Sequence, residues 1–304
     1  MIYTASTIDL LKYVLRLLRR EKMNYSQELV KELQLKAIQV RANILEMIPP
    51  GKVGHLGGSS SIADVMAALY FHTMKVNKDD PKDPSRDRLI MSKGHAVLVQ
   101  YACLAELGYF ERSELGKVKT FEGILQGHPD MDKTPGIEAV TGSLGQGLSV
   151  SLGVALGLTL DKSESRVYTI LGDGELAEGQ VWEAVMAASV FKASNLTAFV
   201  DWNGVQATST TAEIFPIGNL VEKWKAFGWN VIEIDGHDMV QVLGAIDAAK
   251  AYKEGPTAIM AHTIKGKCFP FAEGKAKYHN AAMTEEEYKI AWQCIDSMRK
   301  EVEA

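Results

Sequence analysis

Cysteine is scarce in this sequence. Only three cysteines occur among the 304 residues, and they lie far apart at Cys103, Cys268 and Cys294. Three scattered cysteines exclude a disulfide framework and a cysteine-rich zinc cluster. A reducing compartment is the simplest setting for such a chain, so we expect a cytoplasmic protein.

Long apolar runs are also lacking, because none reaches the roughly 18 residues that a membrane-spanning helix needs. The nearest candidate is residues 10–18, which Lys12 and Arg16 interrupt. This stretch could be a basic amphipathic surface anchor or a targeting peptide, but no signal-peptide cleavage pattern follows it. We favour an N-terminal helical arm at residues 1–24 that packs on this chain or on a neighbour, and we expect no membrane partner.

Positive charge is in deficit. The 33 Lys and Arg residues are outnumbered by 38 Asp and Glu residues, which gives a formal net charge of -5. Since phosphate backbones favour a basic stripe, nucleic acid is not expected as a partner. What the sequence does contain, 46% hydrophobic and 23% charged residues, is typical of a globular protein with a sizeable core.

Short apolar runs alternate with longer helical patterns through most of the chain. The expected strands are residues 88–91, 167–171, 196–200, 231–234 and 257–260, and the helices between them lie near 143–160, 178–192, 218–227 and 238–252. This alternation predicts an α/β fold with a doubly wound, mostly parallel sheet flanked by helices. No repeat or low-complexity linker divides residues 25–304, so we expect one domain. Ligands bind at the carboxyl ends of the strands in such sheets.

Helices and loops are also expected in the segments outside the sheet. Apolar residues at helical spacing predict a helix from about 27 to 48, which two prolines end. A loop rich in glycine and serine follows, and Ser61 is expected to cap the next helix. Residues 77–87 read as a charged loop. A C-terminal helix is expected from Thr284 to Glu303, with Glu287 completing a capping box.

The strongest chemical signal follows the predicted strand at 167–171. It is the run Gly172-Asp173-Gly174, and Asn203 comes thirty positions after Asp173, behind the next strand. A carboxylate, an amide and a backbone carbonyl offer hard oxygen ligands to Mg²⁺ or Ca²⁺ and leave places for phosphate oxygens. The glycines allow close approach of the backbone, and the helix beyond them favours anions. A lone Gly-Asp-Gly is more often an ordinary turn, but the asparagine at this spacing favours a diphosphate site.

Three histidines lie in glycine-bearing loops: His55, His95 and His128. A single histidine is more often structural than catalytic, but three in such loops favour a site. The glycine run at 141–147 could pass for a dinucleotide fingerprint, yet no predicted strand precedes it, so we do not expect a dinucleotide.

Together these motifs resemble transketolase, specifically its N-terminal, diphosphate-binding section, in order and spacing from about residue 25 to residue 280. The Gly-Asp-Gly with its asparagine is similar to the thiamine-diphosphate signature. Trp202 stands where the signature has a first asparagine, at a position where transketolases vary. The runs Ser92-Lys93-Gly94-His95, Gly127-His128-Pro129 and Thr141-Gly142-Ser143-Leu144-Gly145-Gln146-Gly147 resemble further transketolase motifs.

The resemblance implies thiamine diphosphate as cofactor with Mg²⁺ or Ca²⁺ as its metal. The implied metal ligands are Asp173, Asn203 and the Val205 carbonyl, the implied cofactor contacts are His95, Gly142, Ser143, Leu144, Asp173, Gly174, Glu178 and Asn203, and the implied catalytic histidines of the sugar channel are His55, His128 and His279. The sequence departs from the family around His279, since Cys268 replaces a common glycine and Asn280 follows the histidine.

Several charged residues have a plainer interpretation. Glu178 and Glu183 match acidic residues near the interface between cofactor sites, but a helix start and a helix face also carry such charges. His72, His237 and His262 match no motif, so structural roles are expected for them.

The resemblance also implies a partner. In the family, the glutamate that contacts the aminopyrimidine and the aromatic cradle of the pyrimidine lie in a domain that follows the matched section. The sequence therefore resembles the N-terminal subunit of split transketolases. We expect a C-terminal subunit that carries the pyrimidine domain, the activating glutamate and most sugar-phosphate contacts, in an α2β2 assembly. The expected reaction transfers a two-carbon ketol unit from a ketose (phosphate) to an aldose (phosphate).

Other functions remain open at this point. The α subunit of a 2-oxo acid dehydrogenase shares the cofactor signature but lacks the combination of histidine motifs. A 1-deoxyxylulose-phosphate synthase carries both domains in one chain. A non-catalytic subunit could retain a cofactor site, although intact Asp173, Asn203 and loop histidines argue against decay. The motifs leave the identity of the sugars undecided.

Overall fold

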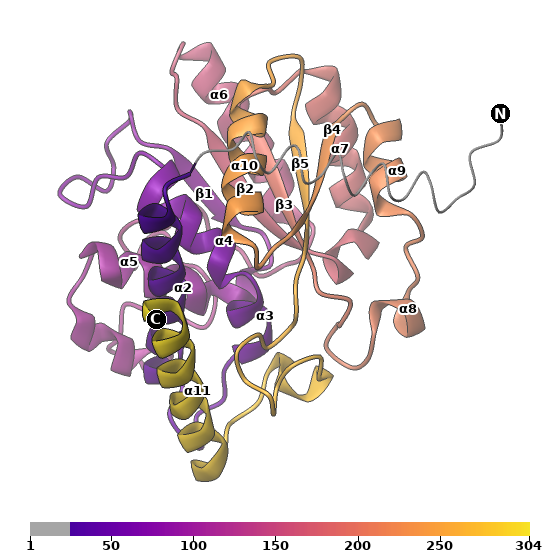
Figure 1. Cartoon of the computed structure of the whole chain (residues 1–304). Coiled ribbons are helices and arrows are strands. Elements are labelled where there is room, and N and C mark those ends of the chain that lie inside the picture. Colours follow the sequence, from indigo (N-terminus) through magenta and orange to yellow (C-terminus); the bar gives the residue numbers. More distant parts are fainter. Residues whose placement is uncertain (1–24) are drawn as a thin grey trace.

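One parallel sheet forms the centre of the computed structural model, which describes residues 25–304 (Figure 1). The predicted arm at residues 1–24 lies outside the described residues. The strands are β1 (Arg88–Met91), β2 (Val167–Gly172), β3 (Leu196–Trp202), β4 (Asn230–Asp235) and β5 (Thr257–His262), in the order β1-β2-β3-β5-β4. All four pairings are parallel, so the predicted fold class is confirmed.

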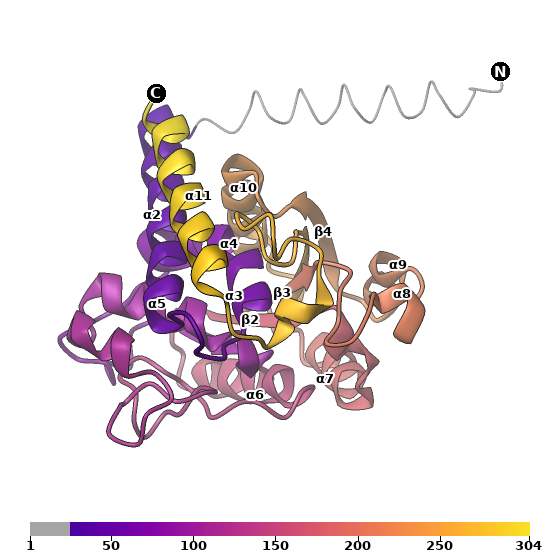
Figure 2. The same cartoon turned by 90° about the horizontal axis from the view of Figure 1, so that it is seen from below.

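Helices cover both faces of this sheet, as Figure 2 shows. One face packs against α2 (Gln27–Met47), α4 (Ala63–Ala68), α5 (Val97–Leu107) and α10 (Met239–Ala251). The other packs against α6 (Gln146–Leu160), α7 (Gly179–Val190) and α9 (Leu220–Ala226).

Successive residues of the central strands alternate between these two cores. Tyr168 and Ile170 of β2 belong to the first core, whereas Val167 and Leu171 belong to the second. Side chains of a strand point alternately to opposite faces, and a sheet covered on both faces needs apolar residues at both sets of positions. This is why the strands read as nearly continuous apolar runs in the sequence.

Short elements complete the connections. They are α3 (Leu56–Ser61), α8 (Thr211–Ile214), a π-helical turn (Leu69–Thr73), and 3-10 turns at Gly94–Ala96, Arg112–Lys117, Gly174–Ala177 and Ala276–His279. Residues 77–87 contain no helix or strand, as expected.

The C-terminal helix α11 (Glu285–Glu303) lies along α2 in both views (Figures 1 and 2). Its apolar residues Ala291 and Ile295 are buried. The Thr284 side chain accepts from the backbone N–H of Glu287, and the Glu287 side chain accepts from that of Thr284, so the predicted capping box is confirmed.

One local prediction is wrong. Residues 56–61 are helical, not a loop, and Ser61 ends α3 instead of capping α4, whose N-cap is Ile62. The Ser61 hydroxyl lies within hydrogen-bond distance of the Gly58 carbonyl and donates to the buried Asp201 carboxylate at 2.6 Å. A charged acceptor makes a stronger hydrogen bond than a neutral one, so this hydroxyl turns inward.

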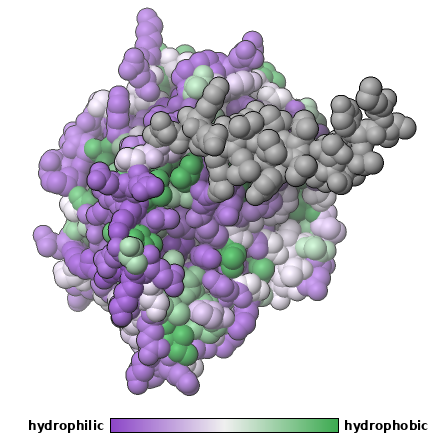
Figure 3. Space-filling model, viewed as in Figure 1, coloured by the Kyte–Doolittle hydropathy of each residue, from purple (hydrophilic) through white to green (hydrophobic). Residues whose placement is uncertain are grey.

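The surface in Figure 3 is mostly hydrophilic, with apolar residues in small groups between polar ones. Within residues 25–304, no helix has the length and apolar character needed to cross a membrane.

Replacing the helix cap should destabilise the fold measurably. We expect Thr284→Ala to lower the free energy of unfolding by about 1 kcal/mol, because a backbone N–H of α11 loses its acceptor. Urea unfolding followed by circular dichroism measures this. Thr284→Ser keeps the hydroxyl and is the matched control. Equal losses in both variants would show that the cap contributes nothing.

Candidate active site

The predicted motifs gather at the carboxyl edge of the sheet, as expected for parallel strands. The chain leaves β1 toward His95, β2 toward Asp173 and β3 toward Asn203, and the segment after β5 carries Lys265 and His279. Hydrogen bonds and ring contacts between these segments define the site.

A buried ion pair forms the floor of the site. The Lys93 ammonium lies 2.5 Å from a carboxylate oxygen of Asp201, and their side chains are 2% and 0% exposed. Lys93 also donates to the Gly58 carbonyl at 2.8 Å. Burial opposes ionisation of Asp201, but the charge of Lys93 and several hydrogen bonds outweigh it and lower the pKa of this carboxyl. A buried pair of this kind needs every remaining hydrogen bond satisfied.

Asp201 meets this need with three further side-chain donors. It accepts from Ser61 of α3 at 2.6 Å, from the amide of Asn203 at 2.9 Å, and from the Thr263 hydroxyl after β5. The Asn203 amide nitrogen donates to Asp201, so the amide oxygen points the other way. This oxygen accepts from the N–H of Val205 at 3.1 Å. Asp201 thus determines which way Asn203 points.

Asp173 lies beside this network and is buried. Its carboxylate accepts from the N–H of Gly174 at 2.7 Å and from the N–H of Gly204 at 2.5 Å, so the segments after β2 and β3 are in contact. Burial, and then the nearby charge of Asp201, raise the pKa of Asp173 to about 6. The site therefore contains buried negative charge that its own cations compensate only in part.

Lys265 is a second buried cation, and no sequence motif indicated that it belongs to the site. Its ammonium donates to the carbonyls of Val205 at 2.7 Å and Gln206 at 3.1 Å, and it lies 3.0 Å from Nδ1 of His279. Burial, and then the charge of Lys93, lower the pKa of Lys265 to about 8. The Val205 carbonyl is thus directed toward a cation within the site.

Four histidines from four segments form one cluster. The ring centroid of His55 lies 5.3 Å from that of His95, 6.0 Å from that of His128 and 5.5 Å from that of His279. The ring centroids of His95 and His279 are 4.7 Å apart. His279 is therefore brought together with the three loop histidines, despite its weaker sequence match.

The imidazoles of the cluster are neutral. Burial, aided by neighbouring positive charges, lowers the pKa of His55 to about 3, of His95 to about 2 and of His279 to about 4, and it also lowers that of His128. A neutral imidazole offers one donor and one acceptor. Because the Lys265 ammonium can only donate, Nδ1 of His279 accepts from it and Nε2 of His279 carries the proton.

The glycine run at 141–147 packs tightly against the histidine loops. A Cβ on Gly94 would lie 2.8 Å from the backbone nitrogen of Gly142, and a Cβ on Gly142 would lie 3.0 Å from the His128 ring. Gly142 also has a φ of +150°, which disfavours a side chain. The glycines of both motifs are therefore needed for the loops to approach each other.

Glu175 joins this run to its neighbours and was also missed. It is buried, and it accepts from Ser92 at 2.5 Å, from the N–H of Gly145 at 2.9 Å and from the N–H of Gly172 at 3.0 Å. In the sequence, only its position two residues after Asp173 indicates that Glu175 belongs to the site.

Other expected site residues lie nearer the surface. Ser143 and Glu178 are exposed and Leu144 is half-buried. Glu178 is the N-cap of α7, next to Gly145, and Glu183 lies on the exposed face of that helix.

The remaining histidines contact other residues. His237 pairs with Asp64 at 2.8 Å, and His262 pairs with Glu233 at 2.9 Å while stacking on Trp202. His72 is exposed.

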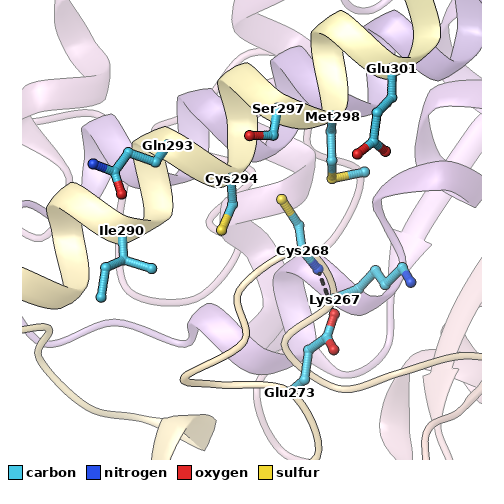
Figure 4. Close-up of a pocket in the computed structure, with 9 residues that line it drawn as sticks. All are labelled: Lys267, Cys268, Glu273, Ile290, Gln293, Cys294, Ser297, Met298 and Glu301. Atoms are coloured by element: carbon cyan, nitrogen blue, oxygen red, sulfur yellow. Dashed lines mark hydrogen bonds between the residues drawn. The ribbon is translucent and has the colours of Figure 1, made fainter.

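A cavity of about 380 Å³ lies between α11 and residues 267–273 (Figure 4). Cys268 and Cys294 both point into it. Burial raises the pKa of both thiols, to about 12 for Cys268. Protonated thiols are weak nucleophiles and weak metal ligands, and none of the four clustered histidines lines this cavity.

A cluster of three or more His, Cys, Asp or Glu side chains suited to a metal does not occur among residues 25–304. A metal at Asp173 would depend instead on the Asn203 amide and a backbone carbonyl, which are ordinary ligands of Mg²⁺ and Ca²⁺.

Comparison with known proteins identifies the same section of chain. A family model described as the thiamine diphosphate binding domain of transketolase matches residues 32–296. A 6-deoxy-6-sulfo-D-fructose transketolase subunit of Clostridium sp. (strain MSTE9) is 45% identical over 260 residues, which are 86% of this chain and 94% of that protein. An apulose-4-phosphate transketolase subunit of Phocaeicola vulgatus is 38% identical over 86% of this chain and 93% of its own length.

Longer transketolases match over part of their length. Human transketolase is 35% identical over 91% of this chain but only 44% of its own length. The crystal structure of the Campylobacter jejuni enzyme has a TM-score of 0.79 at 26% identity, covering 92% of this chain and 46% of that one. The Leishmania mexicana enzyme has a TM-score of 0.76 at 27% identity, covering 90% and 45%. The chain thus spans about half the length of these enzymes.

The half-buried histidines of the cluster should stay neutral when the pH is lowered. We expect the Cε1–H signals of His55, His95 and His279 in metal-free protein to remain unchanged from about pH 8 to about pH 5 in NMR spectra. The Cε1–H signal that disappears from the spectrum of the His95→Gln variant is that of His95. A midpoint above about pH 6 for His95 would contradict the burial argument.

The same depressed pKa values affect stability. Below about pH 6.5 an unfolded histidine takes up a proton that the buried one does not, so the unfolded state binds more protons and stability falls as the pH is lowered. Asp173 acts in the opposite direction, because its folded pKa of about 6 lies above its unfolded value. NMR titration, which follows the histidine signals one by one, separates the effect of the histidines from that of Asp173.

Proposed function

The chain belongs to the transketolase family, and on that premise we propose that it is the thiamine-diphosphate-binding subunit of a two-subunit enzyme. This enzyme transfers a two-carbon ketol unit from a ketose (phosphate) to an aldose (phosphate). The observation that carries the proposal is the joining of the Asp173 and Asn203 segments beside a cluster of four neutral imidazoles. Residues that hold a diphosphate and residues that handle a sugar would then share one site.

Thiamine diphosphate, when bound, supplies carbanion chemistry that amino acid side chains lack. The residues present fit its diphosphate end, since the buried ammonium of Lys265 donates to the carbonyls of Val205 and Gln206 and makes no hydrogen bond to a carboxylate within residues 25–304. Backbone also approaches closely, because a Cβ on Gly174 would lie 2.8 Å from the Gln206 side chain. The proposed cofactor contacts are His95, Gly142, Ser143, Leu144, Asp173, Gly174, Glu178 and Asn203.

For the metal, we propose Asp173, the Asn203 amide oxygen and the Val205 carbonyl as ligands of Mg²⁺ or Ca²⁺. Two observations support this set. The pKa of Asp173 is raised by burial and by Asp201, so a divalent cation would relieve uncompensated negative charge. The Val205 carbonyl already accepts from a cation, the Lys265 ammonium. All three ligands are hard oxygens of the kind these metals prefer.

The proposed catalytic side chains are His55, His128 and His279. As neutral imidazoles they can orient sugar hydroxyls, and they can relay a proton by accepting it on one ring nitrogen and releasing one from the other. His279 has the most defined role. Lys265 occupies its Nδ1, so Nε2–H is its donor toward a substrate oxygen.

A partner subunit is part of the proposal. Two relatives named as subunits match over 94% and 93% of their own length, whereas human transketolase matches over 44% of its length. We propose that a C-terminal transketolase subunit supplies the pyrimidine domain, the activating glutamate and most sugar-phosphate contacts. Exposed apolar side chains on α6 and α7, namely Val150, Met186 and Val190, support further contacts between copies in an α2β2 assembly.

The cytoplasm is the proposed compartment, because all three cysteines are free thiols. The relatives reported above are transketolases or transketolase subunits. They do not favour the α subunit of a 2-oxo acid dehydrogenase or a non-catalytic subunit.

Removing the proposed metal ligand should abolish tight cofactor binding. We expect Asp173→Asn to weaken thiamine diphosphate binding in the presence of Mg²⁺ by more than about 100-fold, since even outer partners of a metal site contribute 10–100-fold. Isothermal titration with the purified chain, alone and with its partner, measures the affinity. Asp161→Asn, at the opposite edge of the sheet, is the control. Unchanged affinity in Asp173→Asn would refute the ligand assignment.

Ketol transfer should require both subunits. We expect the chain alone to show no transfer, and an equimolar mixture with the C-terminal subunit to show it, because the aminopyrimidine must contact a glutamate supplied in trans. A coupled assay of aldose release measures this, with His279→Ala in the same mixture as the inactive reference. Full activity of the isolated chain would contradict the two-subunit proposal.

A further inference from the structure

The loop at residues 117–125 borders the histidine cluster, and none of its residues has yet been given a function. Its base is fixed, because Val118 and Leu125 are fully buried and the N–H of Lys119 donates to the Leu125 carbonyl at 2.8 Å. Its tip closes on itself through the N–H of Gly123, which donates to the Thr120 carbonyl. Lys119 is therefore held at a defined place, where the exposed tip meets the buried base.

Lys119 lies between the two segments that carry His55 and His128. Its ammonium donates to the carbonyl of Val53 at 3.1 Å, two residues before His55. A Cβ on Gly127, the residue before His128, would lie 3.3 Å from Cε of Lys119. The lysine stem thus passes over Gly127 and ends beside Val53.

The backbone of Lys119 is unusual, with a φ of +58°. A residue with a side chain rarely adopts this left-handed conformation, because its Cβ approaches the following carbonyl oxygen too closely. Such outliers persist only where the surrounding structure imposes them and are common at ligand-binding sites.

A second lysine stands beside the first. Lys52 donates to the Gly116 carbonyl at 3.3 Å, and partial burial, together with the charge of Lys119, lowers its pKa. Burial and then the charge of Lys119 also lower the pKa of His128. No ion pair found within residues 25–304 includes either lysine. The outer edge of the cluster therefore carries two positive charges that no neighbouring carboxylate balances.

Burial decreases from the floor of the site to this edge. Lys93 and Asp201 are almost completely buried, His55 is half-buried, and His128 and Lys119 are exposed. A substrate that reaches the histidines from solvent would pass Lys119. The two ammonium groups can bind an oxyanion as point charges.

We propose that Lys119, with Lys52 beside it, binds the anionic group of the sugar substrate, so that this subunit helps to select substrates by their charge. The proposal rests on the ketol-transfer function proposed above and deepens it. The group is a tetrahedral oxyanion, either a phosphate or a sulfonate. Lys119 acts on binding of the substrate, not on the chemical step.

The test compares charged and uncharged substrates in the reconstituted two-subunit enzyme. With one aldose acceptor held constant, the ketose is supplied as a phosphate ester, as a sulfonate or without a charged group. We expect Lys119→Met to raise KM for the two anionic ketoses by about tenfold or more, the value of one charged hydrogen bond, with kcat and the KM of the neutral ketose unchanged. Lys119→Arg should restore most of the loss, and a larger effect on one anion identifies the preferred group.

Lys162→Met is the matched control. Lys162 is exposed and also has a left-handed backbone, with a φ of +55°, but it precedes β2 at the opposite edge of the sheet. An equal rise of KM for neutral and anionic ketoses in Lys119→Met would mean that the loop is only structural, and unchanged KM values for all three would mean that Lys119 does not contact substrate. Either result overturns the inference, whereas absence of ketol transfer in the unmodified mixture would overturn the proposed function itself.

Discussion

The buried carboxylate of Asp201 is the interaction on which the site depends. It binds Lys93 from the segment after β1, Ser61 from α3, Asn203 from the segment after β3 and Thr263 from the segment after β5. A fully buried charge is tolerated only when it is paired and hydrogen-bonded, and removing one partner of such a pair typically costs about 3–5 kcal/mol. Asp201 at the end of β3 therefore holds the segment after β1, α3 and the segment after β5 against its own strand.

This constraint also determines the charges around it. Burial raises the pKa of Asp173, and the negative charge of Asp201 adds to this effect although Asp201 is paired with Lys93. Burial, aided by the charges of Lys93 and Lys265, lowers the pKa values of His95 and His279 and keeps both imidazoles neutral. The charged groups proposed to hold a metal and a diphosphate thus lie next to the imidazoles proposed to bind sugar hydroxyls, through the contact of Lys265 with His279. Both halves of the proposed chemistry follow from one buried network.

Much of the fold could be predicted from the sequence, but less of the site. The strands were recognisable because apolar runs bounded by loops are what a sheet covered on both faces requires, and Asp173 and Asn203 were recognisable because each directly follows such a strand. The helix at 56–61 was not, since its glycines and serines are poor helix formers and only burial against neighbouring segments stabilises it. The partners Lys93 and Asp201 are 108 residues apart, and Ser92 and Glu175 are 83 apart. No local pattern reports pairings at such separations, and the depressed pKa values of the histidines follow from the same long-range packing.

The position of a bound metal ion is the most direct test of the proposed site. Crystals of the chain with its partner, grown with thiamine diphosphate and Mn²⁺, can be measured for anomalous diffraction at the manganese edge. We expect one strong peak per chain in contact with Asp173, the Asn203 amide oxygen and the Val205 carbonyl, next to the electron density of a diphosphate. Density for the cofactor with no peak there, or a peak bound by other residues, would contradict it.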